Sequence, residues 1–426
     1  MKPYVEMSKE ELTAEYEALK ASYQAYVDRH LSLNMARGKP GSDQLDLSRG
    51  MLDVINSASD LTASDGTDAR NYGCLDGLPE AKKLLGDMMD SDPEDVIVYG
   101  NSSLNIMYDQ IARSYTFGVM GNTPWCQLDG PVKWLCPVPG YDRHFGITEF
   151  FGIEMINIPM HEDGPDMDAV EAFVKDPAVK GIWCVPKYSN PGGVVYSDEV
   201  IDRFAHLQPA AKDFRIYWDN AYCIHHLYEE IDIPDILKAC KEAGHPDLVY
   251  KFGSTSKITF PGAGIAALAT SPNNKKDILN QMKHQTIGHD KLNQLRHVRF
   301  FGDLNGLKEH MKKHADLIRP KFEAVEKTLN EQLGGLEIGT WTHPKGGYFI
   351  SFTGLDGTAQ EIVAKMKEAG VVMTGAGATY PYHKDPHDSN IRIAPTLPPL
   401  DEIALAAEIF ATVVKLVSAE KLLAQK

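Results

Sequence analysis

The sequence predicts an α/β protein with a large domain over residues 50–305 and a smaller α+β domain formed by residues 1–49 and 306–426. Seven short runs of β-branched or apolar residues recur between residues 95 and 270, most of them separated by enough chain for a helix. Such runs are typical of a parallel sheet with helices on both faces. We therefore expect a mostly parallel seven-stranded sheet sandwiched by helices. The expected strands span residues 96–99, 134–138, 154–158, 181–185, 215–218, 248–252 and 264–269.

The two ends of the chain carry the patterns of the smaller domain. Ser8 and Glu11 form a capping-box pattern that predicts the start of an amphipathic helix. Residues 31–48 are polar and rich in Gly and Pro, which predicts a loop with short extended pieces. Beyond residue 274 an apolar stripe predicts a long helix that is kinked at Pro320. We also expect a strand pair over 341–352, strands at 371–374 and 391–394, and a final helix over 401–423.

Composition and charge disfavour several classes of protein. The 426 residues include 43 Lys and Arg against 59 Asp and Glu, and the net charge of −16 argues against a nucleic-acid-binding surface. The six cysteines show no paired spacing and are expected to be reduced thiols. No secretion signal is visible, and no apolar run approaches the roughly 20 residues that span a bilayer. We therefore expect a cytoplasmic protein that binds neither nucleic acid nor membrane.

Polar residues of unusual kinds follow four of the expected strands. In chain order they are Asn101, Ser102 and Ser103, then Asn190, then Asp219 and Tyr222, and last Ser254, Ser256 and Lys257. Taken singly, each group is explained as a helix cap, a turn or an exposed lysine. Taken together they suit one ligand, because a lysine amine can form a Schiff base with an aldehyde cofactor. A carboxylate can hold a pyridinium nitrogen, and hydroxyls at a helix N-terminus suit a phosphate.

The same segments resemble a known family, the fold-type-I aminotransferases that depend on pyridoxal 5′-phosphate. The resemblance covers nearly the whole chain and lies in LNMARGKP, YGNSSLNIM, KYSNPGG, YWDNAYCIHH, GSTSKITFPGAG and NIRIAP. Asn190, Asp219 and Lys257 keep the order of the family, with separations of 29 and 38 residues. Within the family the chain is most similar to a bacterial aspartate aminotransferase subgroup, which is related to the aminotransferase half of MocR-type regulators.

The resemblance implies a role for each residue around the cofactor. It implies that Lys257 forms the Schiff base and moves the proton, and that Asp219 keeps the pyridine nitrogen protonated. Asn190 and Tyr222 are implied to hydrogen-bond the ring oxygen, and Tyr141 to stack on the pyridine face. The implied phosphate site includes Asn101, Ser102, Ser103, Ser254 and Ser256.

Three further features concern the substrate, the partner subunit and the phosphate. Arg392 is implied to grip the substrate α-carboxylate, since a guanidinium binds both oxygens at once, and Gly38, Arg37 and Asn190 are implied to contact the substrate. Tyr72 is implied to reach the phosphate of the neighbouring subunit, which predicts a homodimer with shared sites. Many relatives carry an Arg in a PGxR segment after the lysine. In relatives that Arg pairs with the cofactor phosphate. This chain has Pro261-Gly262-Ala263-Gly264-Ile265 instead, so the residue that balances the phosphate charge is not assigned.

The implied reaction is ping-pong transamination between an amino acid and a 2-oxo acid. The subgroup suggests L-aspartate and 2-oxoglutarate as substrates, giving oxaloacetate and L-glutamate. A second carboxylate needs a second cation, for which Arg37, Lys39 and Arg143 are candidates. An aminotransferase for aromatic or other neutral amino acids, including kynurenine and alanine, fits the same residues. So does β-elimination or decarboxylation on the same cofactor, or a non-catalytic regulatory protein that binds an effector.

Two weaker signals point elsewhere. Residues 375–380 nearly spell a dinucleotide fingerprint, but the third glycine is missing, so we expect a loop near the pocket. The pairs His225–His226 and His383–His387 raise the question of a metal. Adjacent histidines point apart and Pro386 interrupts the second pair, so we expect satisfied or surface histidines and no metal site.

Overall fold

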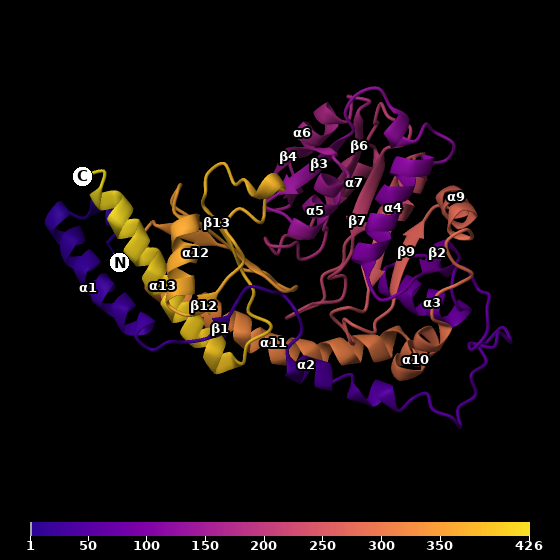
Figure 1. Cartoon of the computed structure of the whole chain (residues 1–426), viewed down its shortest axis with the longest axis horizontal. Coiled ribbons are helices and arrows are strands. Elements are labelled where there is room, and N and C mark those ends of the chain that lie inside the picture. The colour runs from indigo at the N-terminus through magenta and orange to yellow at the C-terminus, as the bar shows by residue number, and fades with distance from the viewer. Residues whose placement is uncertain (1) are drawn as a thin grey trace.

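The computed structural model describes residues 2–426 and contains one large sheet and two small ones (Figure 1). The strand order in the large sheet is β2-β9-β8-β7-β6-β3-β4-β5. The seven expected strands are all present, and the two-residue β5 adds an eighth by folding back on β4. The bounds are β2 Val96–Val98, β3 Lys133–Val138, β4 Glu154–His161, β5 Gly164–Pro165, β6 Val179–Cys184, β7 Arg215–Asp219, β8 Val249–Ser254 and β9 Ala266–Thr270.

The centre of the large sheet is parallel and its edges are antiparallel. Strands β8, β7, β6, β3 and β4 run parallel to one another, whereas β9 is antiparallel to both β8 and β2, and β5 is antiparallel to β4. The expected mostly parallel sheet is therefore confirmed. Because the central strands share one direction, their carboxyl ends meet at a single edge, where ligands of such sheets bind.

Helices cover both faces of the large sheet, as expected. Successive side chains of a strand point to opposite faces, so Trp134 and Tyr217 pack with one helical layer and Leu135 and Trp218 with the other. The first layer contains α4 Ser103–Phe117, α5 Asp142–Phe150 and α9 Pro272–Met282. The second contains α6 Met167–Phe173, α7 Asp198–Ala205 and α8 Ile236–Glu242. Helices α3 Pro79–Met88 and α10 Lys291–Phe301 cover the edge formed by β2 and β9.

The two ends of the chain build the second region together. Helix α1 Lys9–Val27 begins at the expected capping box, in which the Glu11 backbone N–H donates to Ser8 Oγ at 3.1 Å. It packs on the last helix, α13 Leu400–Leu423, and β1 Leu33–Asn34 pairs in parallel with β12 Val371–Val372. Beside them lies an antiparallel sheet of β10 Gly339–Trp341, β11 Ile350–Gly354 and β13 Asn390–Ile393, together with α12 Ala359–Glu368.

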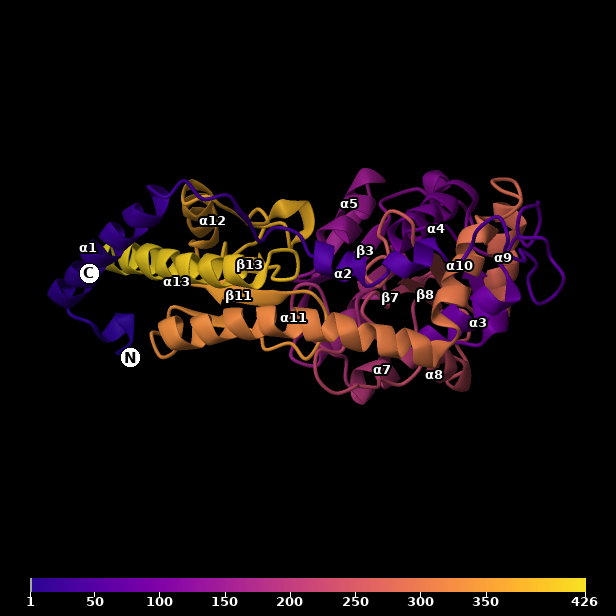
Figure 2. The same ribbon diagram turned by 90° about the horizontal axis from the view of Figure 1, so that it is seen from below.

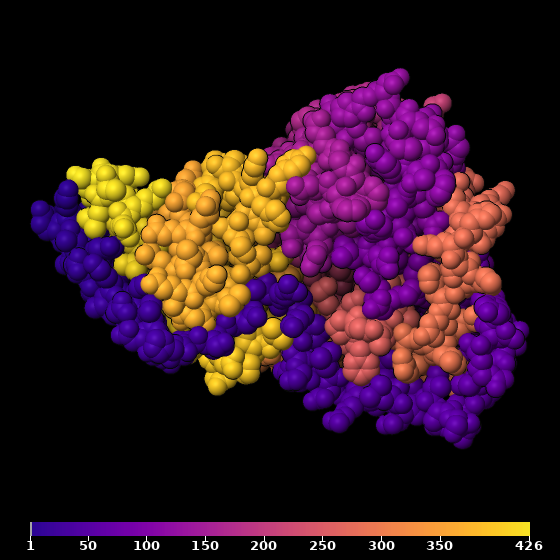
Figure 3. Space-filling model, viewed as in Figure 1, coloured from indigo at the N-terminus to yellow at the C-terminus, as the bar shows by residue number. Residues whose placement is uncertain are grey.

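One long helix joins the two regions. Helix α11 Leu304–Leu333 runs alongside both of them, as Figure 2 shows, and its expected apolar stripe is buried. It continues through Pro320 as a single helix. In Figure 3 the N-terminal chain, coloured indigo, passes along the lower edge of the orange region and reaches the large-sheet side. Domain boundaries at residues 49/50 and 305/306 stay a prediction.

The expectation for residues 31–48 was partly wrong. They contain the short helix α2 Ser42–Asp46, which follows the extended pieces and leads through a turn into the next helix. Gln44 stabilises its start, since Gln44 Oε1 accepts the Gly41 backbone N–H at 3.1 Å. Short 3-10 helices complete the fold at Tyr4–Glu6, Arg49–Leu52, Pro93–Asp95, Trp125–Gln127 and Pro381–His383. Across residues 2–426, no helix combines the length and apolar character needed to cross a bilayer.

Candidate active site

A cavity of about 150 Å³ lies at the carboxyl ends of β6, β7 and β8. It brings together the predicted cofactor residues, with Asn101 and Tyr72 as the exceptions. Those lining it are Ser102, Ser103, Tyr141, Asn190, Asp219, Tyr222, Ser254, Ser256 and Lys257. Residues that are up to 155 positions apart in the chain thus face one space.

Asp219 ends β7 and is almost completely buried, with 3% of its surface exposed. His144 Nε2 lies 2.9 Å from Asp219 Oδ2. The His144 ring stacks on Trp183, with centroids 4.5 Å apart and planes 13° apart. Asp219 Oδ1 is buried and has no hydrogen-bond partner within residues 2–426. One carboxylate oxygen is therefore fixed, and the other is left for a donor in the cavity.

Lys257 follows β8 and its amine faces Tyr222. The Nζ atom lies 5.1 Å from the centroid of the Tyr222 ring. Burial lowers the pKa of the Lys257 amine and Arg392 lowers it further, whereas Asp219 acts in the opposite direction. The Tyr348 hydroxyl donates to the Lys257 carbonyl at 3.3 Å and helps to hold the backbone here. The result is an amine that loses its proton more readily than an exposed lysine does.

Serine hydroxyls gather beside the N-terminus of α4. Ser102 is the N-cap residue of this helix and makes no capping hydrogen bond with its own side chain. Ser254 Oγ donates to Ser256 Oγ at 3.1 Å, and Ser256 Oγ donates to the Asn101 carbonyl at 3.0 Å. Free backbone N–H groups, the helix dipole and hydroxyls together suit an anion. The Asn101 amide donates to the Pro261 carbonyl at 3.2 Å, and Asn101 does not line this cavity.

The segment without the family's arginine is closely packed. A Cβ atom on Gly264 would lie 2.8 Å from Thr255 Oγ1, the atom that accepts the Ile265 backbone N–H. The Asn293 amide holds the Ala263 and Gly264 carbonyls at 3.0 and 2.9 Å. Among residues 2–426, Lys257 is the one cationic side chain that lines the small cavity. Neutral donors and the α4 dipole thus surround the candidate phosphate position.

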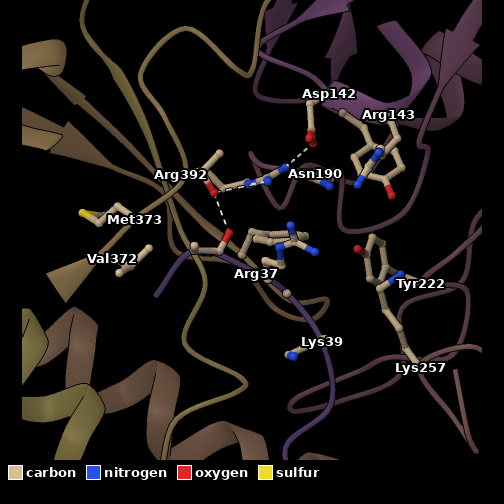
Figure 4. Close-up of a pocket in the computed structure, with 15 residues that line it drawn as sticks. Arg37, Lys39, Asp142, Arg143, Asn190, Tyr222, Lys257, Val372, Met373 and Arg392 are labelled. Atoms are coloured by element: carbon tan, nitrogen blue, oxygen red, sulfur yellow. Dashed lines mark hydrogen bonds and ion pairs between the residues drawn. The ribbon is translucent and has the colours of Figure 1, made fainter. Parts of the chain in front are cut away.

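A larger pocket of about 540 Å³ adjoins the cavity, and Figure 4 shows its residues. The two spaces share Tyr141, Asn190, Tyr222 and Lys257. Arg392 enters the larger pocket from β13, and its guanidinium lies 4.9 Å from the centroid of the Phe349 ring. A ligand in the larger pocket can therefore contact Arg392 and Lys257 together.

Arg392 has three partners inside the protein. Its Nη1 donates to Asp142 Oδ1 at 2.9 Å and to Asn190 Oδ1 at 3.2 Å. Its Nη2 donates to Thr374 Oγ1 at 3.3 Å. Sequence reasoning missed Asp142, Thr374 and His144. A signal for His144 was available, because it follows Tyr141 by about one helical turn.

Three further cations line the larger pocket: Arg37, Lys39 and Arg143. Within residues 2–426 their side chains form no ion pair or hydrogen bond. Gly38 lets the N-terminal segment approach this pocket closely, since a Cβ there would lie 2.3 Å from the Phe349 ring. The pocket therefore offers cationic groups besides Arg392 to an anionic ligand.

The remaining predicted features lie outside the two spaces. Tyr72 is 81% exposed and lines neither of them. His225 contradicts the expectation of satisfied or surface histidines, because it is buried and neither ring nitrogen has a partner within residues 2–426. His226 Nδ1 does have one, since it lies 2.6 Å from the Tyr188 hydroxyl. The described residues include no group of three or more side chains suited to a metal.

Comparison with known proteins places the fold and the site in a family. A family profile described as aspartate amino-transferase matches residues 7–426. An aspartate aminotransferase of Corynebacterium glutamicum is 45% identical over 407 residues, which cover 95% of this chain and 94% of that protein. The chain belongs to the aspartate aminotransferase family. A solved aspartate transaminase structure from C. glutamicum superposes with a TM-score of 0.96 at 44% identity and covers 99% of both chains.

Membership of the aspartate aminotransferase family confirms the resemblance seen in the sequence. The protein is an aminotransferase, an enzyme that uses pyridoxal 5′-phosphate to exchange an amino group between an amino acid and a 2-oxo acid. The link to regulators is also found. An HTH-type transcriptional regulator of Bacillus subtilis is 26% identical over 216 residues, half of this chain and 43% of that protein.

Proposed function

We propose that this aminotransferase exchanges the amino group of L-aspartate with 2-oxoglutarate to give oxaloacetate and L-glutamate. The observation that carries the proposal is the charge of the larger pocket, where Arg392 and three cations without partners adjoin Lys257. Each of the four compounds carries two carboxylates, so a pocket for them needs cations at both ends of the ligand. The name of the C. glutamicum relative supports the same choice.

The small cavity fits pyridoxal 5′-phosphate. Asp219 Oδ1 is a buried acceptor without a partner, which suits the protonated ring nitrogen of a pyridinium. Ser102, Ser254 and Ser256 stand beside the α4 N-terminus, which suits the phosphate. When bound, the cofactor supplies an aldehyde and a ring that withdraws electrons from the substrate. We propose that Lys257 holds it covalently, while Asn190 and Tyr222 donate to its ring oxygen and Tyr141 lies against its face.

Each side chain then has a task that its surroundings favour. Lys257 Nζ would take the proton from the substrate Cα and deliver it to the aldehyde carbon of the cofactor, and burial favours the neutral amine that this base needs. His144 holds the orientation of the Asp219 carboxylate. Arg392 binds the α-carboxylate and so directs the Cα–H bond towards Lys257. Amino acid and oxo acid use the same pocket in turn, which gives ping-pong kinetics.

The test is a half-reaction followed by a comparison of substrates. Purified holoenzyme given aspartate alone should release about one oxaloacetate for each active site, because no second substrate resets the enzyme. Lys257→Ala should release none, and Lys276→Ala on the exposed face of α9 should behave as the wild type does. With 2-oxoglutarate present, kcat/KM for aspartate should exceed that for phenylalanine and alanine. A preference for phenylalanine or alanine would show a neutral-substrate aminotransferase instead.

We also infer a homodimer whose sites are shared between subunits. Tyr72 is 81% exposed and Ile287 is 60% exposed. Their loops touch, since a Cβ on Gly288 would lie 2.5 Å from the Gly73 carbonyl oxygen. Large apolar groups that stand exposed side by side favour burial against another protein surface. Sedimentation equilibrium should give twice the mass of a single chain.

A further inference from the structure

Arg392 already has a carboxylate partner within its own chain. The ion pair with Asp142 is 2.9 Å long, and the Arg392 side chain is only 7% exposed (Figure 4). A buried guanidinium needs a counter-charge, because an unpaired charge away from water is costly. Asp142 supplies that charge, and its own side chain is 26% exposed where it lines the larger pocket. It is therefore within reach of an entering ligand.

The pair joins two parts of the fold. Asp142 is the first residue of α5, which covers the large sheet, whereas Arg392 lies in β13 of the small antiparallel sheet. Asn190, the second acceptor of Nη1, also belongs to the large-sheet side. The hydrogen bonds of Nη1 therefore fasten the small sheet to the large-sheet region along the wall of the larger pocket.

The hydrogen atoms of Arg392 limit how a substrate carboxylate can bind. Nη1 has two, and both are taken by Asp142 and Asn190. Nη2 has two, and one is taken by Thr374, while Nε is buried and has no partner within residues 2–426. A carboxylate that binds with both oxygens needs two parallel donors. The hydrogens that remain, on Nε and Nη2, form such a pair only along the edge where Nε is buried, so a carboxylate that approaches Nη1 and Nη2 from the pocket meets donors that are already largely occupied.

We propose that Asp142 is an internal competitor for Arg392, which the substrate α-carboxylate must displace. The proposal rests on the role of Arg392 in the proposed function. Among the three partners of Arg392, Asp142 alone carries the same charge as the ligand, so its departure also removes a repulsion. Occupation of Arg392 by Asp142 lowers the fraction of protein that is ready to bind, and apparent affinity falls by that fraction. When Asp142 pairs again with Arg392, it also favours release of the product.

The test measures binding of succinate, which has two carboxylates and no amino group to react. Asp142→Asn keeps the shape of the side chain and removes its charge, and calorimetry on the holoenzyme should show succinate binding about fivefold tighter. Glu149→Gln is the matched control, because it removes one charge from the exposed face of the same helix and should leave binding unchanged. In steady state, KM for aspartate should fall in Asp142→Asn while kcat does not rise.

Equal or weaker binding of succinate by Asp142→Asn would overturn the proposal and show that Asp142 only orients Arg392. Asp142→Ala should also bind succinate more tightly, and it serves as the test if the asparagine variant does not fold. Arg392→Lys tests the carboxylate site at Arg392 separately from the competition by Asp142. If that variant binds succinate as well as the wild type does, Arg392 is not the carboxylate site, and the proposed substrate pose fails with it. If Arg392→Lys weakens binding while Asp142→Asn has no effect, only the competition is refuted.

Discussion

His144 Nε2 lies 2.9 Å from Asp219 Oδ2, with both side chains buried and the histidine ring flat against Trp183. The pair fixes the carboxylate from the side that faces away from its unpartnered oxygen. The hydrogen bond therefore sets the direction in which the unpartnered Oδ1 of Asp219 faces.

His144→Phe should lower kcat for aspartate by about tenfold or more, because a hydrogen bond to a charged group contributes roughly 1.5–3 kcal/mol. Phenylalanine keeps the stacking on Trp183 and removes the donor, so the loss reports the hydrogen bond rather than the packing. Steady-state kinetics on the holoenzyme measures the effect. The control is His161→Phe, which makes the same change at an exposed position of β4 and should leave kcat unaltered. Unchanged kcat in His144→Phe would show that Asp219 needs no partner.

The lowered pKa of Lys257 should appear in the stability of the cofactor-free protein. The folded state binds this proton less tightly than the unfolded chain, in which lysine has a pKa of about 10.4. The resulting destabilisation is complete below the folded pKa and disappears as the pH rises from the folded to the unfolded pKa. Lys257→Met should therefore raise Tm at pH 7, and the gain should shrink towards pH 10. A gain that stays constant with pH, or equals that of Lys276→Met, would contradict burial of the charged amine.

Arg392→Lys should raise KM for aspartate and alanine alike by at least about thirtyfold, since one ammonium cannot replace a fork of two donors. Both substrates carry the α-carboxylate, so the effect should not depend on the side chain. The measurement is kcat/KM for each amino acid. A loss confined to aspartate would place Arg392 at the other end of the substrate.

Substitution of the three cations without partners should instead affect the KM of one substrate and not of the other. We expect at least one of Arg37→Met, Lys39→Met and Arg143→Met to raise KM for aspartate by about tenfold or more while leaving alanine unaffected, because only aspartate has a second carboxylate. Kinetics with both substrates on the three single variants identifies the residue. If none of them discriminates between the substrates, the second carboxylate is bound elsewhere.

Tyr72→Phe should weaken retention of pyridoxal 5′-phosphate without changing the mass of the assembly. The hydroxyl is the group implied to reach the neighbouring phosphate, while the ring provides the apolar contact. Dialysis followed by absorbance measures the retained cofactor, and sedimentation checks the dimer. Tyr382→Phe, at another exposed tyrosine, is the control. Equal retention in Tyr72→Phe and the wild type would remove Tyr72 from the site.

Much of the architecture could be predicted because its signals are local. The apolar runs at β3, β6 and β7 are buried on both faces, and turn-forming or polar residues mark their ends. The lysine and aspartate of the small cavity were found because each directly follows such a run. Helix α2 was missed because its stability depends on Gln44, whose amide donates to the Tyr348 hydroxyl at 2.9 Å far along the chain.

The partners of the site residues had no comparable signal. Asp142 meets Arg392 across 250 positions of sequence, and nothing near either residue indicates the other. The unpartnered nitrogens of His225 depend in the same way on which side chains surround that ring after folding. Sequence patterns thus located most of the polar residues that line the two spaces, whereas the groups that orient them depend on tertiary contacts.

The packing of α1 on α13 has a consequence for synthesis of the chain. The buried residues Leu12, Leu19 and Tyr23 are synthesised long before α13, the helix that covers them. During translation the large sheet can assemble before α13 is made, and until then the apolar side of α1 stays exposed to water and to other nascent chains. Burial of the apolar side of α1 therefore requires α13, and a chain truncated before residue 400 should be aggregation-prone rather than a shorter enzyme.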